Sequence, residues 1–139
     1  MTDALGFEVR LTMVHEAAIA YVTQALKAEG FGILSRIEIH KAFREKIGEE
    51  FRPYTILGAC NPKLAHVALS SKPELGLMLP CNLTVEANGE GSIVRIINPA
   101  VMMQVGELGS DAAVVGVAKE ATARLKRVAA ALIGEIKNS

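Results

Sequence analysis

The feature that most constrains this chain is a pair of strand-like runs around a glycine-rich turn. "PCNLTVEA" and "SIVRIIN" flank "NGEG". Asparagine and glycine supply the positive φ angles that a tight turn between antiparallel strands needs. We therefore predict a hairpin that turns at Asn88-Gly89 and carries Cys81, Leu83, Val85 and Ala87 on one face.

Three further strands are predicted upstream. In "FEVRLTM" apolar and polar residues alternate, which is typical of a half-buried strand. "FGILSRIEIHK" follows the same rule and predicts a strand with Ile33, Ser35, Ile37 and Ile39 on one face. "YTILGAC" is compact and apolar and predicts a third strand that ends at Cys60.

Helices are expected between and after these strands. Residues 14–29 repeat apolar side chains every three or four positions, and Gly30 is the predicted end of that helix. Phe43, Ile47 and Phe51 predict a short helix that Pro53 stops. Asn61 should cap another that starts at Pro62. A long final helix is also expected. We therefore predict a single α+β domain over 1–139, with about five strands and with helices mainly on one face of a two-layer structure.

Composition excludes some partners. The chain has 15 Lys and Arg against 15 Asp and Glu, and only 4% aromatic residues, so we expect no nucleic acid partner. The start has no basic segment and no window reaches the ~18 apolar residues of a membrane helix, so we expect no membrane partner. The expected location is the cytoplasm, where two cysteines are reduced thiols by default.

The two cysteines are the main candidates for a functional site. Cys60 directly precedes Asn61, and Cys81 directly precedes Asn82. At the positive end of a helix dipole, the pKa of Cys60 should fall below the usual ~8.5. Adjacent strands would bring both thiols together, which predicts a ligand-binding or redox-responsive site. The alternative is core packing, because cysteine often behaves as a small buried hydrophobe.

Two other chemistries use the same cysteines. Cys60, Cys81 and His66 form a weak set of metal ligands, because the cysteines lie 21 positions apart and lack a close C-x₂-C pair. Cys60 could instead serve as an enzyme nucleophile with His66 as its base. On a helix that starts at Pro62, however, the His66 ring should point away. The sequence names no cofactor.

Arg95 lies between Ile93 and Ile97 on the second hairpin strand. A charge flanked by buried positions needs a partner or a ligand, and a cross-strand pair with a carboxylate is the favoured explanation.

The segments "EKIGEEFRPYTILGACNPKLAHVAL" and "ELGLMLPCNLTVEANGEGSIVRIINPAVMM" closely resemble the bacterial and archaeal family called domain of unknown function 302. The resemblance extends roughly from Phe7 to Ala131. It implies a small α+β protein that assembles as a homodimer, with no established biochemical function. Many relatives carry acids where this chain has Arg36-Ile37-Glu38, so only Glu38 remains as a candidate carboxylate there.

Taken together, these features predict a homodimeric module that binds a small ligand or metal, or responds to redox state, around Cys60 and Cys81. The Met102-Met103 doublet adds a reason to expect a subunit contact, because both cannot face one core from a helix. A thiol enzyme and a purely structural or interaction protein are the two alternative classes.

Overall fold

The computed structural model describes residues 5–138, with side chains through residue 134. Five strands form one sheet in the order β1-β5-β4-β3-β2, and every neighbouring pair is antiparallel. This confirms the predicted α+β class. The strands are β1 (Gly6–Leu11), β2 (Gly32–Glu38), β3 (Tyr54–Cys60), β4 (Cys81–Asn88) and β5 (Gly91–Ile97).

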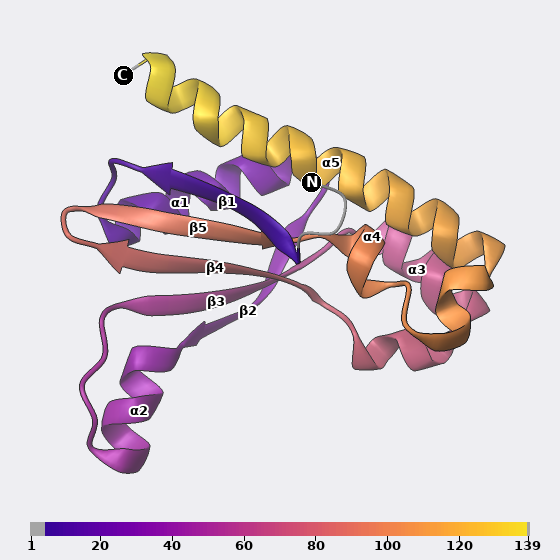
Figure 1. The fold of residues 1–139 in the computed structure, drawn as a ribbon, viewed down its shortest axis with the longest axis horizontal. Coiled ribbons are helices and arrows are strands. Elements are labelled where there is room, and N and C mark those ends of the chain that lie inside the picture. The colour runs from indigo at the N-terminus through magenta and orange to yellow at the C-terminus, as the bar shows by residue number, and fades with distance from the viewer. Residues whose placement is uncertain (1–4, 139) are drawn as a thin grey trace.

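The helices are arranged unevenly around this sheet (Figure 1). α1 passes behind the strands, α5 runs along the upper side of the view, and α3 and α4 gather under one end of α5. α2 projects from the lower end of the sheet. The bounds are α1 (His15–Ala28), α2 (Ile39–Ile47), α3 (Pro62–Ser71), α4 (Pro99–Met102) and α5 (Ala112–Asn138), with short 3₁₀ helices η1 (Pro73–Leu77) and η2 (Gly106–Ser110).

The predicted hairpin is present, with its turn one residue further along. Asn88 pairs with Gly91, so Gly89 and Glu90 are the two central residues. Gly89 has φ +61°, which matches the requirement for glycine at the first central position of a type II′ turn. The predicted face is confirmed, because Cys81, Leu83 and Val85 are buried on the same side of β4.

The main core lies between one face of the sheet and helices α1 and α5. Alternate residues of the strands point into it, as period-two alternation requires. Leu57, Leu83, Val85, Val94 and Ile96 come from the sheet, while Val22, Leu26, Leu125 and Leu132 come from the two helices. The expected covering of one face by helices is therefore confirmed, and we call this side the covered face.

A second apolar cluster lies at one end of the molecule, between α3, α4, η1, η2 and the start of α5. Met103 is buried in it, and Met102 packs against it as a half-buried side chain. The doublet thus has a complete explanation within one chain. The argument from Met102-Met103 for a subunit contact is removed, although the homodimer itself stays a prediction.

Two local predictions were wrong. β2 ends at Glu38 and Ile39 begins α2, and the pairing with β3 shifts register between Ile33 and Ser35. The extra residue, Leu34, is 70% exposed. Ile33 therefore points to the covered face and Ile37 to the opposite face, because a bulge of one residue reverses the alternation.

α2 is also shorter than expected. It ends at Ile47, because Gly48 adopts a left-handed conformation with φ +68° and its amide donates back to the Arg44 carbonyl at 3.2 Å. Phe51 lies beyond the helix and not on its stripe.

Candidate functional site

The two cysteines lie where the sequence predicted, at the junction of neighbouring strands. Cys60 ends β3 and Cys81 begins β4, and both are free thiols. Ala59 is the residue that pairs with Cys81, so Cys60 is offset by one position and starts toward the other face of the sheet. Both line one apolar cavity of about 30 Å³ with Leu64 and Met103. That volume suits one or two water molecules at most.

The electrostatics of this cavity do not favour a thiolate. Burial raises the pKa of Cys60 above its ordinary value, and burial, with a smaller effect of a charged Cys60, raises the pKa of Cys81 to about 11. The predicted fall in the pKa of Cys60 is wrong. The Asn61 side chain caps α3, accepting from the Leu64 amide at 3.2 Å. The surrounding side chains are apolar, and they penalise the charged form.

The weak metal set is not assembled around these thiols. His66 is exposed on α3 and is not among the residues that line the cavity. Within the part of the chain that the structure describes, no group of three or more His, Cys, Asp or Glu side chains is placed to hold a metal ion. The same geometry leaves Cys60 without His66 as a base.

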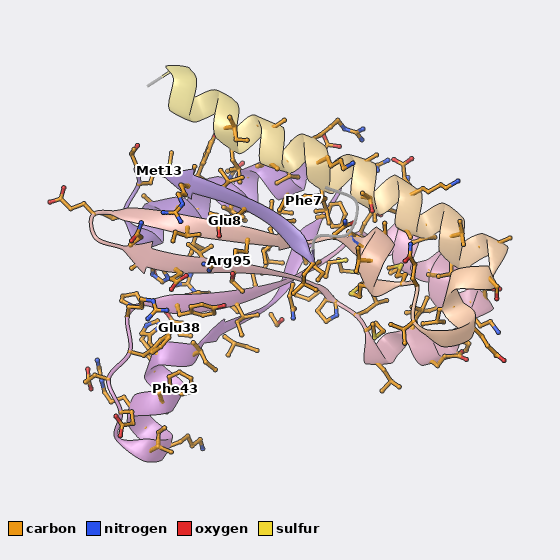
Figure 2. The ribbon with its side chains drawn as sticks, in the orientation of Figure 1. Phe7, Glu8, Met13, Glu38, Phe43 and Arg95 are labelled. Atoms are coloured by element: carbon orange, nitrogen blue, oxygen red, sulfur yellow. The ribbon has the colours of Figure 1, made fainter. Side chains whose placement is uncertain are left out.

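Glu38 lies at the opposite end of β3 from the cysteines. It pairs with Thr55, five residues before Cys60, which corresponds to roughly 17 Å along a strand. Its carboxylate is held by Arg36 at 3.2 Å and Lys41 at 3.0 Å. In Figure 2, Glu38 lies below Glu8 and Arg95, toward α2. Glu38 therefore belongs neither to the cysteine cavity nor to the site described next.

A hollow lies on the face of the sheet opposite α1 and α5, which we call the open face. Its volume is about 430 Å³. It combines apolar walls with polar side chains from three strands and with Tyr54 from a fourth. The lining residues are Leu5, Gly6, Phe7, Glu8, Tyr54, Asn82, Thr84, Arg95, Ile96 and Ile97.

A row of alternating charges crosses the open face beside this hollow. Arg95 of β5 contacts Glu8 of β1 at 3.3 Å and Glu86 of β4 at 2.6 Å. Glu86 also accepts from Arg52, just before β3. The favoured explanation of Arg95, a cross-strand pair with a carboxylate, is confirmed. The hydrogen bond to Glu86 raises the pKa of Arg95, with Glu8 and Tyr54 adding smaller effects.

Glu86 is the centre of this row. Its side chain is only 8% exposed, yet it is charged, because two guanidinium groups compensate it. The hydrogen bond from Arg95, followed by that from Arg52, lowers the pKa of Glu86 below its ordinary value. The charges on this face are therefore satisfied by one another.

The uncharged polar groups of the hollow are not satisfied in the same way. Among the described residues, the Oγ1 of Thr84 is the one buried side-chain polar atom without a hydrogen-bond partner. Asn82, two residues earlier, is exposed on the same face. Across residues 5–134, no hydrogen bond engages its amide or the hydroxyl of Tyr54. Asn82 and Tyr54 thus have unused hydrogen-bonding groups at the hollow, and Thr84, which also lines it, has a buried hydroxyl without a partner.

Tyr54 contacts His40 and Phe51. The Nδ1 of His40 lies 2.9 Å from the Tyr54 amide nitrogen and 3.1 Å from the Tyr54 carbonyl oxygen. The rings of Tyr54 and Phe51 lie 6.1 Å apart, and those of Phe51 and Phe43 lie 5.3 Å apart. An aromatic series therefore runs from α2 to the edge of the hollow and fixes the position of Tyr54.

The sequence-predicted site thus divides. Cys60, Asn61 and Cys81 border the small apolar cavity, whereas Asn82 and Arg95 belong to the open-face hollow. Sequence reasoning missed Tyr54, Thr84 and Glu8. A signal existed in the polar alternation of β4, where Asn82, Thr84 and Glu86 occupy one face, but only the sheet order shows which strands complete that surface.

Comparison with known proteins identifies relatives without a described activity. Residues 7–132 match the family model "Domain of unknown function DUF302". A similar solved structure is described as an uncharacterized conserved protein DUF302 from Bacillus stearothermophilus. It is 26% identical, has a TM-score of 0.77, and the alignment covers 92% of this chain and 95% of that one.

A search of curated proteins gave no match. Among the helices of the described residues, none combines the length and apolar character needed to cross a membrane.

Proposed function

This chain belongs to the DUF302 family, and we propose that it binds a small molecule in the open-face hollow. The observation that carries this proposal is the combination of a cavity of about 430 Å³ with unsatisfied polar groups in its lining. Ligand pockets are usually concave, largely apolar and equipped with a few placed polar groups, with volumes of roughly 300–1,000 Å³.

The energetics of Thr84 support a binding role over a purely structural one. A buried hydroxyl without a partner costs about 1–3 kcal/mol, and valine would fill the same space without that cost. Thr84 lies in the middle of β4, opposite Arg95, where a β-branched apolar side chain would suit the strand equally well. A ligand that bonds to this group gives threonine a function that packing does not.

The cysteine cavity supports a weaker case. Its thiols have raised pKa values and its volume of about 30 Å³ is too small for an organic ligand. A redox-responsive or nucleophilic role for Cys60 is therefore not the function we propose. Of the residues predicted from the sequence, Asn82 and Arg95 carry the proposed binding function.

Homodimerisation remains a separate prediction that rests on the family resemblance. Sedimentation of the purified protein at micromolar concentration tests it, and a monomer there contradicts it.

Titration of ¹⁵N-labelled protein with a set of small neutral aromatic and aliphatic compounds tests the binding proposal. We expect amide shift changes to concentrate on β1, β4 and β5 around the hollow. Ile97→Lys places a charge in its wall and should abolish these changes. Leu77→Lys is the matched control, because Leu77 is 90% exposed on η1 and does not line the hollow.

Two results contradict the proposal. One is that no compound shifts the residues of the hollow. The other is that Ile97→Lys binds the same compounds as well as Leu77→Lys does, since the compounds would then bind elsewhere.

A further inference from the structure

The polar groups of the hollow also restrict the charge of its ligand. We propose that the ligand is an uncharged molecule of about one or two rings that presents an amide or hydroxyl group to Asn82, Thr84 and Tyr54. This inference rests on the proposed binding function and adds the chemical class of the ligand.

The charges of the hollow argue against an ionised ligand. Glu8 and Arg95 are the charged residues that line it, and they contact each other at 3.3 Å. Arg95 also donates to Glu86 at 2.6 Å. A ligand carboxylate would approach one guanidinium group already shared by two carboxylates, so it would have to displace one of them. A ligand cation would be repelled by Arg95 and would have to displace it from Glu8. Either exchange desolvates charges without a net gain of partners.

The neutral groups argue for a ligand that both donates and accepts. The Asn82 amide has donors and an acceptor, and the hydroxyl groups of Thr84 and Tyr54 can do either. A primary amide offers the complementary pair of groups in one plane. Thr84 is the member whose cost is already present in the free protein, because its Oγ1 is buried without a partner. A hydrogen bond from the ligand to Thr84 requires its side chain to rotate, because Oγ1 is buried in the observed rotamer.

The walls set the size and shape. Leu5 and Ile97 supply apolar side chains, and Gly6 adds a wall without a side chain. A cavity of about 430 Å³ lies in the lower part of the range for organic ligands. The apolar body of the ligand would lie against β1 and β5, with its polar edge toward β4 and the start of β3.

An isosteric series of probes separates charge from shape. Benzamide, benzoate and benzamidine have the same ring and nearly the same outline, but they are neutral, negative and positive at pH 7. We expect benzamide to shift the amides around the hollow with an affinity at least about fivefold higher than that of either ion, as measured by ¹⁵N titration at fixed ionic strength.

Substitution at the polar edge gives an independent readout. Thr84→Val should weaken benzamide binding about fivefold, because one hydrogen bond is lost, and should leave the binding of toluene unchanged. Thr12→Val is the matched control, since Thr12 is exposed just beyond β1 and outside the hollow. It should change neither affinity.

The outcomes separate the two proposals. If neutral compounds bind the hollow but benzoate or benzamidine binds as tightly as benzamide, or benzamide does not bind, the charge inference is wrong and the binding function stands. An unchanged benzamide affinity in Thr84→Val also overturns the inference. If no compound binds at the hollow, the proposed function itself fails.

Discussion

The two faces of the sheet are built from the same strands, and they differ in every property that matters here. On the covered face Leu83, Val85 and Val94 are fully buried against α1 and α5. On the open face, Thr84 and Arg95 stand at the intervening positions of the same two strands. One face supplies apolar burial, whereas the other carries paired charges and unused hydrogen-bonding groups.

This difference teaches that a single hairpin can stabilise the fold and build a site at once. Period-two alternation sends successive side chains to opposite faces, so selection for packing acts on one set of positions only. The other set is free to hold polar groups that cost stability. The predictions below test this division, from the largest expected effect to the smallest.

The largest effect is expected on the covered face. Leu83→Ala should lower the free energy of unfolding by about 2–5 kcal/mol, because it leaves a cavity among fully buried side chains. Ile56→Ala, on the open face of the neighbouring strand, should cost under about 1.5 kcal/mol, because Ile56 is only half-buried. Urea unfolding measures both. Equal losses would show that the two faces do not divide stability in this way.

A smaller loss is expected when the centre of the charge row is neutralised. Glu86→Gln should lower the free energy of unfolding by roughly 1–3 kcal/mol, because Arg52 and Arg95 lose a charged acceptor. Glu90→Gln in the exposed hairpin turn is the matched control and should stay within about 0.5 kcal/mol of the wild type.

The contribution of Glu86 has a defined pH dependence. Its pKa in the folded protein lies below the ordinary value of 4.5, so its stabilising effect is complete above pH 4.5 and is lost as the pH falls through the folded-state pKa. The stability difference between wild type and Glu86→Gln should therefore shrink below pH 4.5. A difference that is constant from pH 7 to 3 would mean that the charge of Glu86 contributes nothing.

The cysteines give a kinetic comparison between the faces. Cys81, buried on the covered face with a pKa of about 11, should react with iodoacetamide at pH 8 at least about tenfold more slowly than half-buried Cys60. Mass spectrometry of the Cys60→Ser and Cys81→Ser variants separates the two rates. Cys60 itself should react more slowly than free cysteine, because burial raises its pKa. Rapid labelling of Cys60 at pH 7 would contradict this prediction and would support a reactive thiol at Cys60.

The smallest effect has the opposite sign. Thr84→Val should raise the free energy of unfolding by about 0.5–1.5 kcal/mol, because it removes a buried hydroxyl without a partner. Combined with weaker ligand binding, this gain would identify Thr84 as a residue that trades stability for function. A destabilised Thr84→Val variant would show that the Thr84 hydroxyl has a hydrogen-bond partner in solution. Threonine would then carry no stability cost at this position.

Local sequence patterns determined much of the fold. Alternation in β1 and β4 predicted which residues are buried, because side-chain direction in a strand follows from backbone geometry alone. Asn61 was recognised as a helix cap for a similar reason, since its cap is a hydrogen bond from the amide of Leu64, three positions further on. The bulge at Leu34 was not predicted, because one inserted residue does not change the sequence pattern of a short apolar run.

The site depended on contacts between distant segments. Glu8, Tyr54 and Arg95 meet because β1 pairs with β5 and β3 pairs with β4, and no local pattern encodes that order. The sequence drew attention to Cys60 and Cys81 as a pair, and the strands did bring them to one cavity. Their pKa values, however, depend on the apolar side chains around them, because burial is a property of the assembled core. Sequence alone therefore determined the two faces of the sheet, and the tertiary structure decided which face holds the candidate site.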